Sequence, residues 1–179
     1  MLRKKVSKNF AFIDAQNLNL GVRSQGWKLD WRKFRQYLRS KYGVVKAYLF
    51  IGQVAGNEAL YTFLQECGYI LIFKPTMELP DKMVKGNVDA ELVLHSMIQY
   101  KNYSKAIIVS GDGDFHCLVE YLDQQGKLLH ILTPNRHYSG LLRKFNQHVV
   151  RVDLLRGSLE LSGAFLRIKK TEISGRSKP

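Results

Sequence analysis

The chain is predicted to fold as an α/β protein whose mostly parallel sheet carries helices on both faces. Short apolar runs alternate along the sequence with segments in which apolar residues recur at helical spacing. This alternation is typical of βαβ units, in which each helix returns the chain to the next parallel strand. The 179 residues and the hydrophobic fraction of 45% are enough for one domain with a sizeable core.

The expected strands are continuous apolar runs, the pattern of strands that are buried on both faces. They cover residues 10–13, 44–51, 69–73, 106–109 and 128–132, with a short last strand at 149–152.

The expected helices lie between these strands and have recognisable ends. Asp30 is a favoured N-cap for a helix that ends at Gly43, and Gly68 and Gly126 close two later helices. The helical segments cover residues 31–42, 59–67, 88–100, 115–125 and 141–145.

The rest of the chain is expected to be irregular. A loop with two glycines joins Asn17 to Asp30, and two prolines bracket a segment without periodicity at 74–86. Residues 1–8 form a basic arm and 156–179 a basic tail, so that the domain itself spans 9–155.

The charge balance is strongly basic, with 28 Lys and Arg against 15 Asp and Glu and a formal net charge of +13. Such a field attracts polyanions, above all nucleic acid and to a lesser degree an anionic membrane surface. The alternative is that the charge only serves solubility. The basic face of the expected helix at 31–42 is interpreted as solvated, as such faces usually are.

Two cysteines, Cys67 and Cys117, are too few for a disulfide framework or a zinc site. Both lie on the apolar side of a helical pattern and are expected to be buried free thiols. No apolar run approaches the roughly 20 residues of a membrane span, and no signal peptide follows the basic first residues. A reducing cytoplasm is the expected location. A homodimer is an open alternative to a monomer.

Acidic residues converge on one edge of the predicted sheet. Asp14 ends the first strand, and Asp112 and Asp114 follow the fourth in the turn SGDGDF at residues 110–115. Ligands of open parallel sheets bind at this carboxyl edge, where the acids become neighbours if the two strands are adjacent. Asp89, at the margin of the apolar face of a helix, can turn toward the same edge. Because clustered carboxylates repel unless a proton or cation lies between them, a hard-cation site is predicted.

Structural alternatives stay open for individual acids. Asp114 is a candidate N-cap of the helix at 115, and Asp89 is a first-turn acid favoured by the helix dipole. Asp14 directly follows a buried strand, where burying a carboxylate without a partner costs free energy. An acidic metal site on a basic surface suits cleavage of a phosphodiester, because the metal activates a water and stabilises the leaving oxygen.

Three segments of the sequence resemble the signatures of the NYN domain, a PIN-like family of metal-dependent nucleases. They are FIDAQN at 12–17, KGNVD at 85–89 and VSGDGDF at 109–115, in family order. The resemblance implies a three-layer α/β/α sandwich with a central parallel sheet and metal-dependent cleavage of RNA. It also implies that one or two Mg²⁺ or Mn²⁺ ions are held by the catalytic acids Asp14, Asp89, Asp112 and Asp114.

The resemblance implies further roles around these acids. Asn17 would orient a ligand or water, and Ser110 would support the acids. Lys85 and Ser139 would contact the substrate, although Lys85 could equally be a solvated loop lysine. His95 stands about where members of the family often carry another acid, which leaves open whether one or two metal ions bind.

Two other functions compete with a metal-dependent ribonuclease. A catalytically weak or inactive nucleic-acid-binding module of the same fold is the main alternative; His95 favours it, and retention of the acids opposes it. A phosphatase of the haloacid dehalogenase type also carries Gly-Asp-Gly turns. That chemistry needs a second Asp two residues after the nucleophile, whereas Ala15 and Gln16 follow Asp14.

Overall fold

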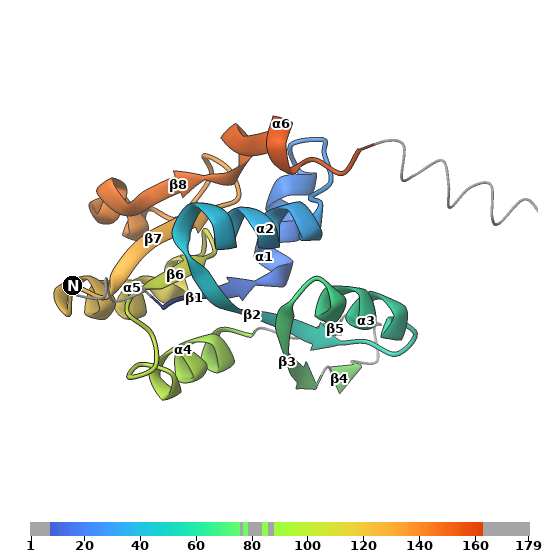
Figure 1. Ribbon diagram of the computed structural model, residues 1–179, viewed down its shortest axis with the longest axis horizontal. Helices are drawn as coiled ribbons and strands as arrows, with labels where there is room; N and C mark the ends of the chain where they lie inside the picture. Colours follow the sequence, from blue (N-terminus) through green and yellow to red (C-terminus); the bar gives the residue numbers. More distant parts are fainter. Residues whose placement is uncertain (1–7, 76, 79–83, 86–87, 163–179) are drawn as a thin grey trace, which may run out of the picture.

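The computed structural model describes residues 8–75, 77–78, 84–85 and 88–162 (Figure 1). Its centre is a six-stranded sheet in the order β3-β2-β1-β6-β7-β8, in which every neighbouring pair is parallel. The strands are β1 (Asn9–Asp14), β2 (Val44–Gln53), β3 (Tyr69–Pro75), β6 (Ala106–Val109), β7 (Leu128–Thr133) and β8 (Val149–Arg151). A separate antiparallel pair joins β4 (Met77–Glu78) and β5 (Val84–Lys85). The parallel sheet predicted from the apolar runs is confirmed.

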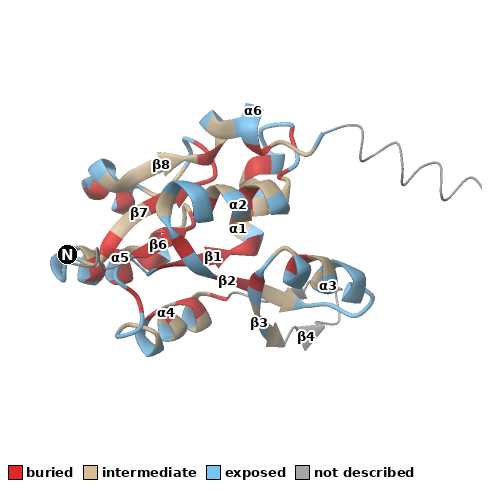
Figure 2. Ribbon diagram, viewed as in Figure 1, coloured by how far each residue is buried: buried red, intermediate tan, exposed pale blue. Residues whose placement is uncertain are grey.

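The side chains of β1 alternate between the two faces of the sheet and enter two hydrophobic clusters. Ala11 and Ile13 belong to the first cluster, and Phe10 and Phe12 belong to the second. Every residue of β1 is buried, because the strand lies between β2 and β6. Figure 2 shows the buried residues concentrated on the central strands. Burial on both faces explains why these strands read as continuous apolar runs.

Helices cover both faces of the sheet, which makes the fold the expected three-layer α/β/α sandwich (Figure 1). The helices that pack into the first cluster are α1 (Ala15–Arg23), α2 (Trp31–Tyr42), α3 (Glu58–Glu66) and α6 (Arg156–Leu159). Those that pack into the second are α4 (Asp89–Ile98), α5 (His116–Gln124) and the 3-10 helices η1 (Gly113–Phe115) and η2 (Gly140–His148). The 3-10 helix η3 (Val152–Leu155) precedes α6.

The ends of α2 agree with the prediction made from its caps. The Asp30 carboxylate accepts hydrogen bonds from the backbone N–H groups of Arg32 at 3.0 Å and Lys33 at 3.2 Å. Gly43 ends the helix in the left-handed region, with φ 63°.

The expectation of a loop after Asn17 is wrong, because residues 15–23 form α1. Leu18 and Val22, four residues apart, are fully buried on one face of this helix. Gly21 is part of the packing: a Cβ atom there would lie 2.4 Å from Cβ of Pro134. Gly21, which the sequence suggested was part of a loop, therefore permits close contact between α1 and the segment after β7.

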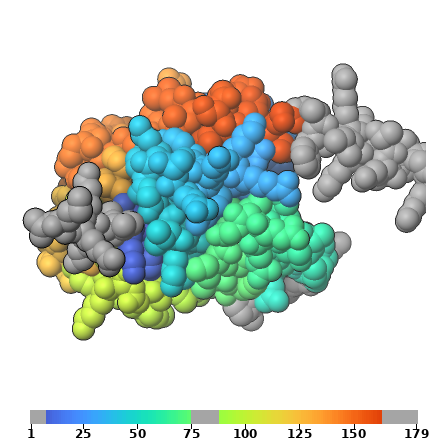
Figure 3. All heavy atoms as spheres, in the orientation of Figure 1, coloured from blue at the N-terminus to red at the C-terminus, as the bar shows by residue number. Residues whose placement is uncertain are grey.

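The end of the described chain is folded onto the domain, although the sequence assigned residues 156–162 to a tail. Leu159 of α6 is buried, and Leu29 forms a β-bridge with Glu160. Figure 3 shows the end of this segment against the chain that enters α2. The arm at residues 1–7 and the tail at 163–179 lie outside the described residues.

Two smaller expectations are also corrected. The helix expected at 141–145 is the 3-10 helix η2, with non-helical backbone angles at Phe145. Cys117 is exposed and Cys67 is half-buried, so neither thiol has the full burial that the helical pattern indicated. No helix of the described chain is long and apolar enough to span a membrane.

Candidate metal centre

The two strands that carry the acids are adjacent, as the prediction of a shared site required. Ile13 of β1 is in register with Val109 of β6. Asp14 and Ser110, the next residue of each segment, therefore stand side by side at the carboxyl edge. Both are buried, with exposed fractions of 6% for Asp14 and 1% for Ser110.

The turn after β6 is held by hydrogen bonds from its own side chains. Ser110 Oγ accepts from the N–H of Asp112 at 3.1 Å, and Asp112 Oδ1 accepts from the N–H of Asp114 at 3.1 Å. Asp112 is thus the N-cap of η1, and the N-cap position of α5 is Phe115, which makes no side-chain capping hydrogen bond. The alternative that Asp114 caps the following helix is wrong. Asp114 is instead exposed.

Three of the predicted acids form a group that could bind a cation. Asp89, Asp112 and Asp114 each offer one carboxylate oxygen, and these oxygens lie within 4.8 Å of one another. Asp89 comes from the first turn of α4, and its Oδ1 is shielded from solvent. Asp89 thus occupies the first turn of α4, as the helix-dipole alternative required. The same position also brings its carboxylate to the turn that carries Asp112 and Asp114.

Asp14 lies outside this group of three but interacts with it electrostatically. Its pKa is raised from 3.8 to about 6, mainly because the carboxyl group is buried. The nearby carboxylates of Asp89 and Asp112 raise the pKa further, while N–H groups of Asn17 and Gln16 donate to Asp14 and lower it. Asp14 also caps α1 through the 3.0 Å hydrogen bond from the N–H of Asn17. It therefore links α1 to the acidic group.

This donor set fits Mg²⁺ or Mn²⁺. Hard divalent cations take carboxylate oxygens and retain several waters, and they do not require a closed cage of protein ligands. The carboxylates are close enough to repel one another, and Asp14 is buried beside them. A bound cation would offset this repulsion and favour the ionised form of Asp14.

Asn17 holds the turn against α1. Its Oδ1 accepts a hydrogen bond from the N–H of Gly111 at 2.9 Å, across 94 residues of sequence. The resemblance implied that Asn17 orients a ligand or water. The structure shows a different contact, in which its amide positions the backbone that carries Asp112.

Ser139 also lies beside the turn. Its N–H donates to the carbonyl of Gly111 at 2.9 Å, and its Oγ accepts from the N–H of Leu141 at 3.3 Å as the N-cap of η2. The approach is tight, since a Cβ on Gly113 would lie 2.3 Å from Ser139 Oγ. Gly113 is required here to let η2 contact the acidic turn.

Two other predicted positions are not part of the group. The His95 ring packs against Phe50 at 5.7 Å and Tyr48 at 6.5 Å between centroids, and it supplies none of the described ligand atoms. Lys85 lies in β5, and its side chain falls outside the described part of the chain.

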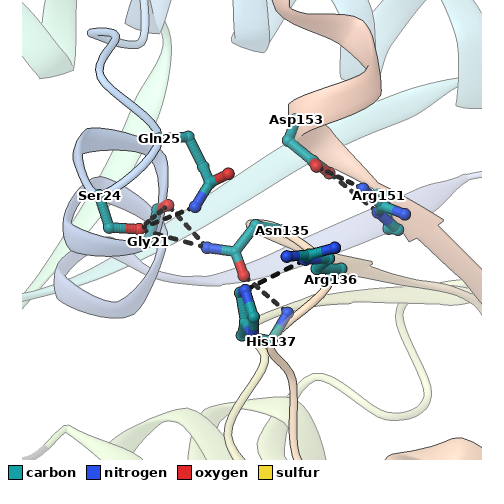
Figure 4. A network of polar contacts seen from close by, with 8 residues as sticks. All are labelled: Gly21, Ser24, Gln25, Asn135, Arg136, His137, Arg151 and Asp153. Atoms are coloured by element: carbon teal, nitrogen blue, oxygen red, sulfur yellow. Dashed lines mark hydrogen bonds and ion pairs between the residues drawn. The ribbon is translucent and has the colours of Figure 1, made fainter.

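The segment after β7 closes over the same edge, and of its residues only Ser139 was expected to belong to the site. Asn135 is buried, donates to the carbonyl of Gly21 at 2.8 Å and accepts from the N–H of His137 at 2.8 Å. Figure 4 shows this network between the end of α1 and the segment leaving β7. Thr133 Oγ1 is buried without a hydrogen-bond partner among the described residues. Polar residues directly after an apolar strand were the signal that could have identified this segment.

Fold and site together define an α/β protein with a PIN-like sheet and an acidic centre at its carboxyl edge. The family model described as "NYN domain" matches residues 10–153. The chain belongs to the NYN domain family, whose members are generally ribonucleases that bind RNA.

Two known proteins are similar to this chain over most of its length. The chain is 23% identical over 159 residues to the low amplitude and bright protein LabA of Synechococcus elongatus, covering 83% of this chain and 86% of LabA. A crystal structure of a protein of unknown function, VPA0982 of Vibrio parahaemolyticus, has a TM-score of 0.74 and 23% identity. That match covers 90% of this chain and 100% of the other, and it shows the shared fold.

Proposed function

We propose that this protein is a metal-dependent ribonuclease that hydrolyses RNA phosphodiester bonds at the acidic centre. The observation that supports the proposal most directly is the group of Asp89, Asp112 and Asp114 oxygens within 4.8 Å of one another, with Asp14 coupled to it. The net charge of +13 supports an anionic polymer as the substrate. The family supports RNA over other polyanions.

Each residue of the centre has a task in this proposal. Asp89, Asp112 and Asp114 would hold Mg²⁺ or Mn²⁺, and Asp14 would complete the negative field beside them. When bound, the cation supplies an activated water and charge stabilisation at the leaving oxygen. Ser110 and Asn17 keep the turn in place through their hydrogen bonds to Asp112 and Gly111, so that the acids are preorganised before RNA arrives.

The direct test is cleavage of a labelled single-stranded RNA by purified protein with Mn²⁺, with Mg²⁺ and with EDTA. Cleavage is expected only with metal, and Asp14→Asn should reduce it to background while RNA binding persists. Asp123→Asn is the matched control, because Asp123 lies in α5 and contacts His148 instead of the acidic group. An Asp14→Asn variant that cuts as fast as the parent protein would refute the proposal.

One observation favours a second candidate, a nucleic-acid-binding module with weak or no catalysis. His95 packs against Phe50 and Tyr48 where other members of the family often carry an acid. In that case RNA binds with the same salt dependence in parent protein and Asp14→Asn, and neither cuts. The free thiols of Cys67 and Cys117 support a reducing cytoplasm as the location in either case.

A further inference from the structure

A cleft of about 570 Å³ opens at the carboxyl edge beside the acidic centre. It lies between α1 and the segment from the end of β2 into α3, on the face of the first hydrophobic cluster. Ala15, the residue after Asp14, forms part of its wall. Consecutive Cα atoms are about 3.8 Å apart, so the wall of this α1 cleft begins next to a residue of the centre.

The lining of the α1 cleft combines aromatic, amide and basic side chains. Trp31 and Tyr61 are half-buried and present ring surface. Gln16, Asn19 and Asn57 add amide groups that can both donate and accept hydrogen bonds. Amides of this kind recognise the polar edges of unpaired bases, and aromatic rings support their faces.

The charge of the α1 cleft is opposite to that of the neighbouring centre. Arg23 and Lys28 lie on its wall, and none of its described lining residues is acidic. Both basic side chains are exposed, so they can reach a phosphate at the cleft mouth. A strand could thus place a base in the α1 cleft while its backbone continues toward the acids.

Gln16 connects the α1 cleft to the centre. Its backbone N–H donates to the Asp14 carboxylate, and the residue also lines the cleft. The first turn of α1 therefore contributes to both sites and sets their relative position.

We infer that the α1 cleft is a base-binding subsite for single-stranded RNA, adjoining the phosphodiester that the acidic centre cleaves. The inference rests on the proposed ribonuclease function for the role of the neighbouring acids. A volume of about 570 Å³ is in the range of pockets that enclose small ligands, and it is large enough to admit a base. Duplex RNA is excluded, because a paired base cannot leave its helix to enter the cleft without losing its partner.

The test measures binding in EDTA, where no cleavage occurs, with a short labelled RNA and copies that lack one base at successive positions. Loss of the base that occupies the α1 cleft should weaken binding about 5- to 150-fold, the range of one stacked base. Asn19→Ala and Lys28→Gln should each weaken binding of the intact strand. In Asn19→Ala, the difference in affinity between the intact strand and the strand that lacks this base (the missing-base penalty) should also be smaller than in the parent protein.

Matched controls lie in the loop between α4 and β6, at the opposite edge of the sheet. Asn102→Ala and Lys101→Gln remove the same side-chain groups from exposed positions there. They should leave the missing-base penalty unchanged. Trp31 fluorescence gives a second readout: it should respond to the intact strand, and the response should disappear in Trp31→Phe, since Trp27 is buried.

The outcomes separate this inference from the proposed function. If base-dependent binding is present but no metal condition gives cleavage, the inference stands and the ribonuclease proposal fails. If RNA is cleaved, the Asn19 and Lys28 variants should raise KM far more than they lower kcat. If every base-lacking strand binds like the intact one and Trp31 does not respond, the inference is overturned whether or not RNA is cut.

Discussion

Replacing Asp14 by asparagine should stabilise the metal-free protein at neutral pH, although it removes a residue of the proposed centre. The pKa of Asp14 is raised from 3.8 to about 6 by burial and by the carboxylates of Asp89 and Asp112. The folded state therefore holds the proton more tightly than the unfolded state, and stability falls as pH rises through this interval. A difference of about 2 pKa units corresponds to about 3 kcal/mol between pH values below 3.8 and above 6.

Most of this change is accessible to measurement. About 2 kcal/mol of it falls between pH 4.5 and pH 7.5. Asparagine does not ionise, so the variant does not lose this stability as pH rises. It keeps a side-chain oxygen that can accept the α1 capping hydrogen bond from the N–H of Asn17. Near pH 7.5 its thermal midpoint in EDTA should consequently exceed that of the parent protein by several degrees, since 1 kcal/mol is worth roughly 2–4 °C at this chain length.

The assay is urea or thermal unfolding of both proteins in EDTA from pH 4.5 to pH 7.5, followed by the same series with Mn²⁺. The difference in stability between variant and parent should grow with pH in EDTA. It should shrink or reverse with Mn²⁺, because the metal stabilises the parent's charged centre. A parent protein that gains stability over the variant as pH rises in EDTA would show that Asp14 is not a strained acid in the folded state.

Three further results are expected. Gly113→Ala should cost about 1–3 kcal/mol in urea unfolding because its Cβ would meet Ser139, whereas Gly140→Ala, with open space around it, should be nearly neutral. Asn17→Ala leaves the Gly111 N–H without its acceptor, which should cost about 1–3 kcal/mol of stability and lower cleavage beyond that effect; equal cleavage rates at a temperature where both proteins are folded would contradict this. RNA affinity should fall with salt at a log–log slope of several units, about 0.7 for each phosphate neutralised on a single strand, and a flat salt dependence would remove the electrostatic argument.

Much of the layout could be predicted from local sequence patterns. Buried strands must be apolar on both faces, so their runs are visible without any knowledge of the fold. Asp30 and Gly43 marked the ends of α2 because capping is a local interaction of neighbouring residues. The placement of Asp14 and Asp112 at one sheet edge followed from parallel strands alone.

Other features depend on contacts between distant parts of the chain, which no local pattern records. Gly21 suggested a loop, but it lies in α1, where Pro134 from the segment after β7 fills the space that a side chain would take. The sequence offered Asp114 as a helix cap, whereas the geometry of the turn makes Asp112 the N-cap of η1. The network of Asn135 joins residues more than a hundred positions apart.

The sequence by itself determined the class of fold, the edge of the sheet that carries the acids and the basic character of the protein, because apolar period, turn residues and charge are properties of the chain. Only the tertiary structure decided that β1 and β6 are neighbours and that Asp89 joins Asp112 and Asp114. It also decided that a cleft begins at Ala15, the residue after Asp14. Strand order and packing are set by interactions between segments that are distant in the sequence, and local patterns do not contain those interactions. The acidic centre and its neighbouring cleft exist because those segments meet.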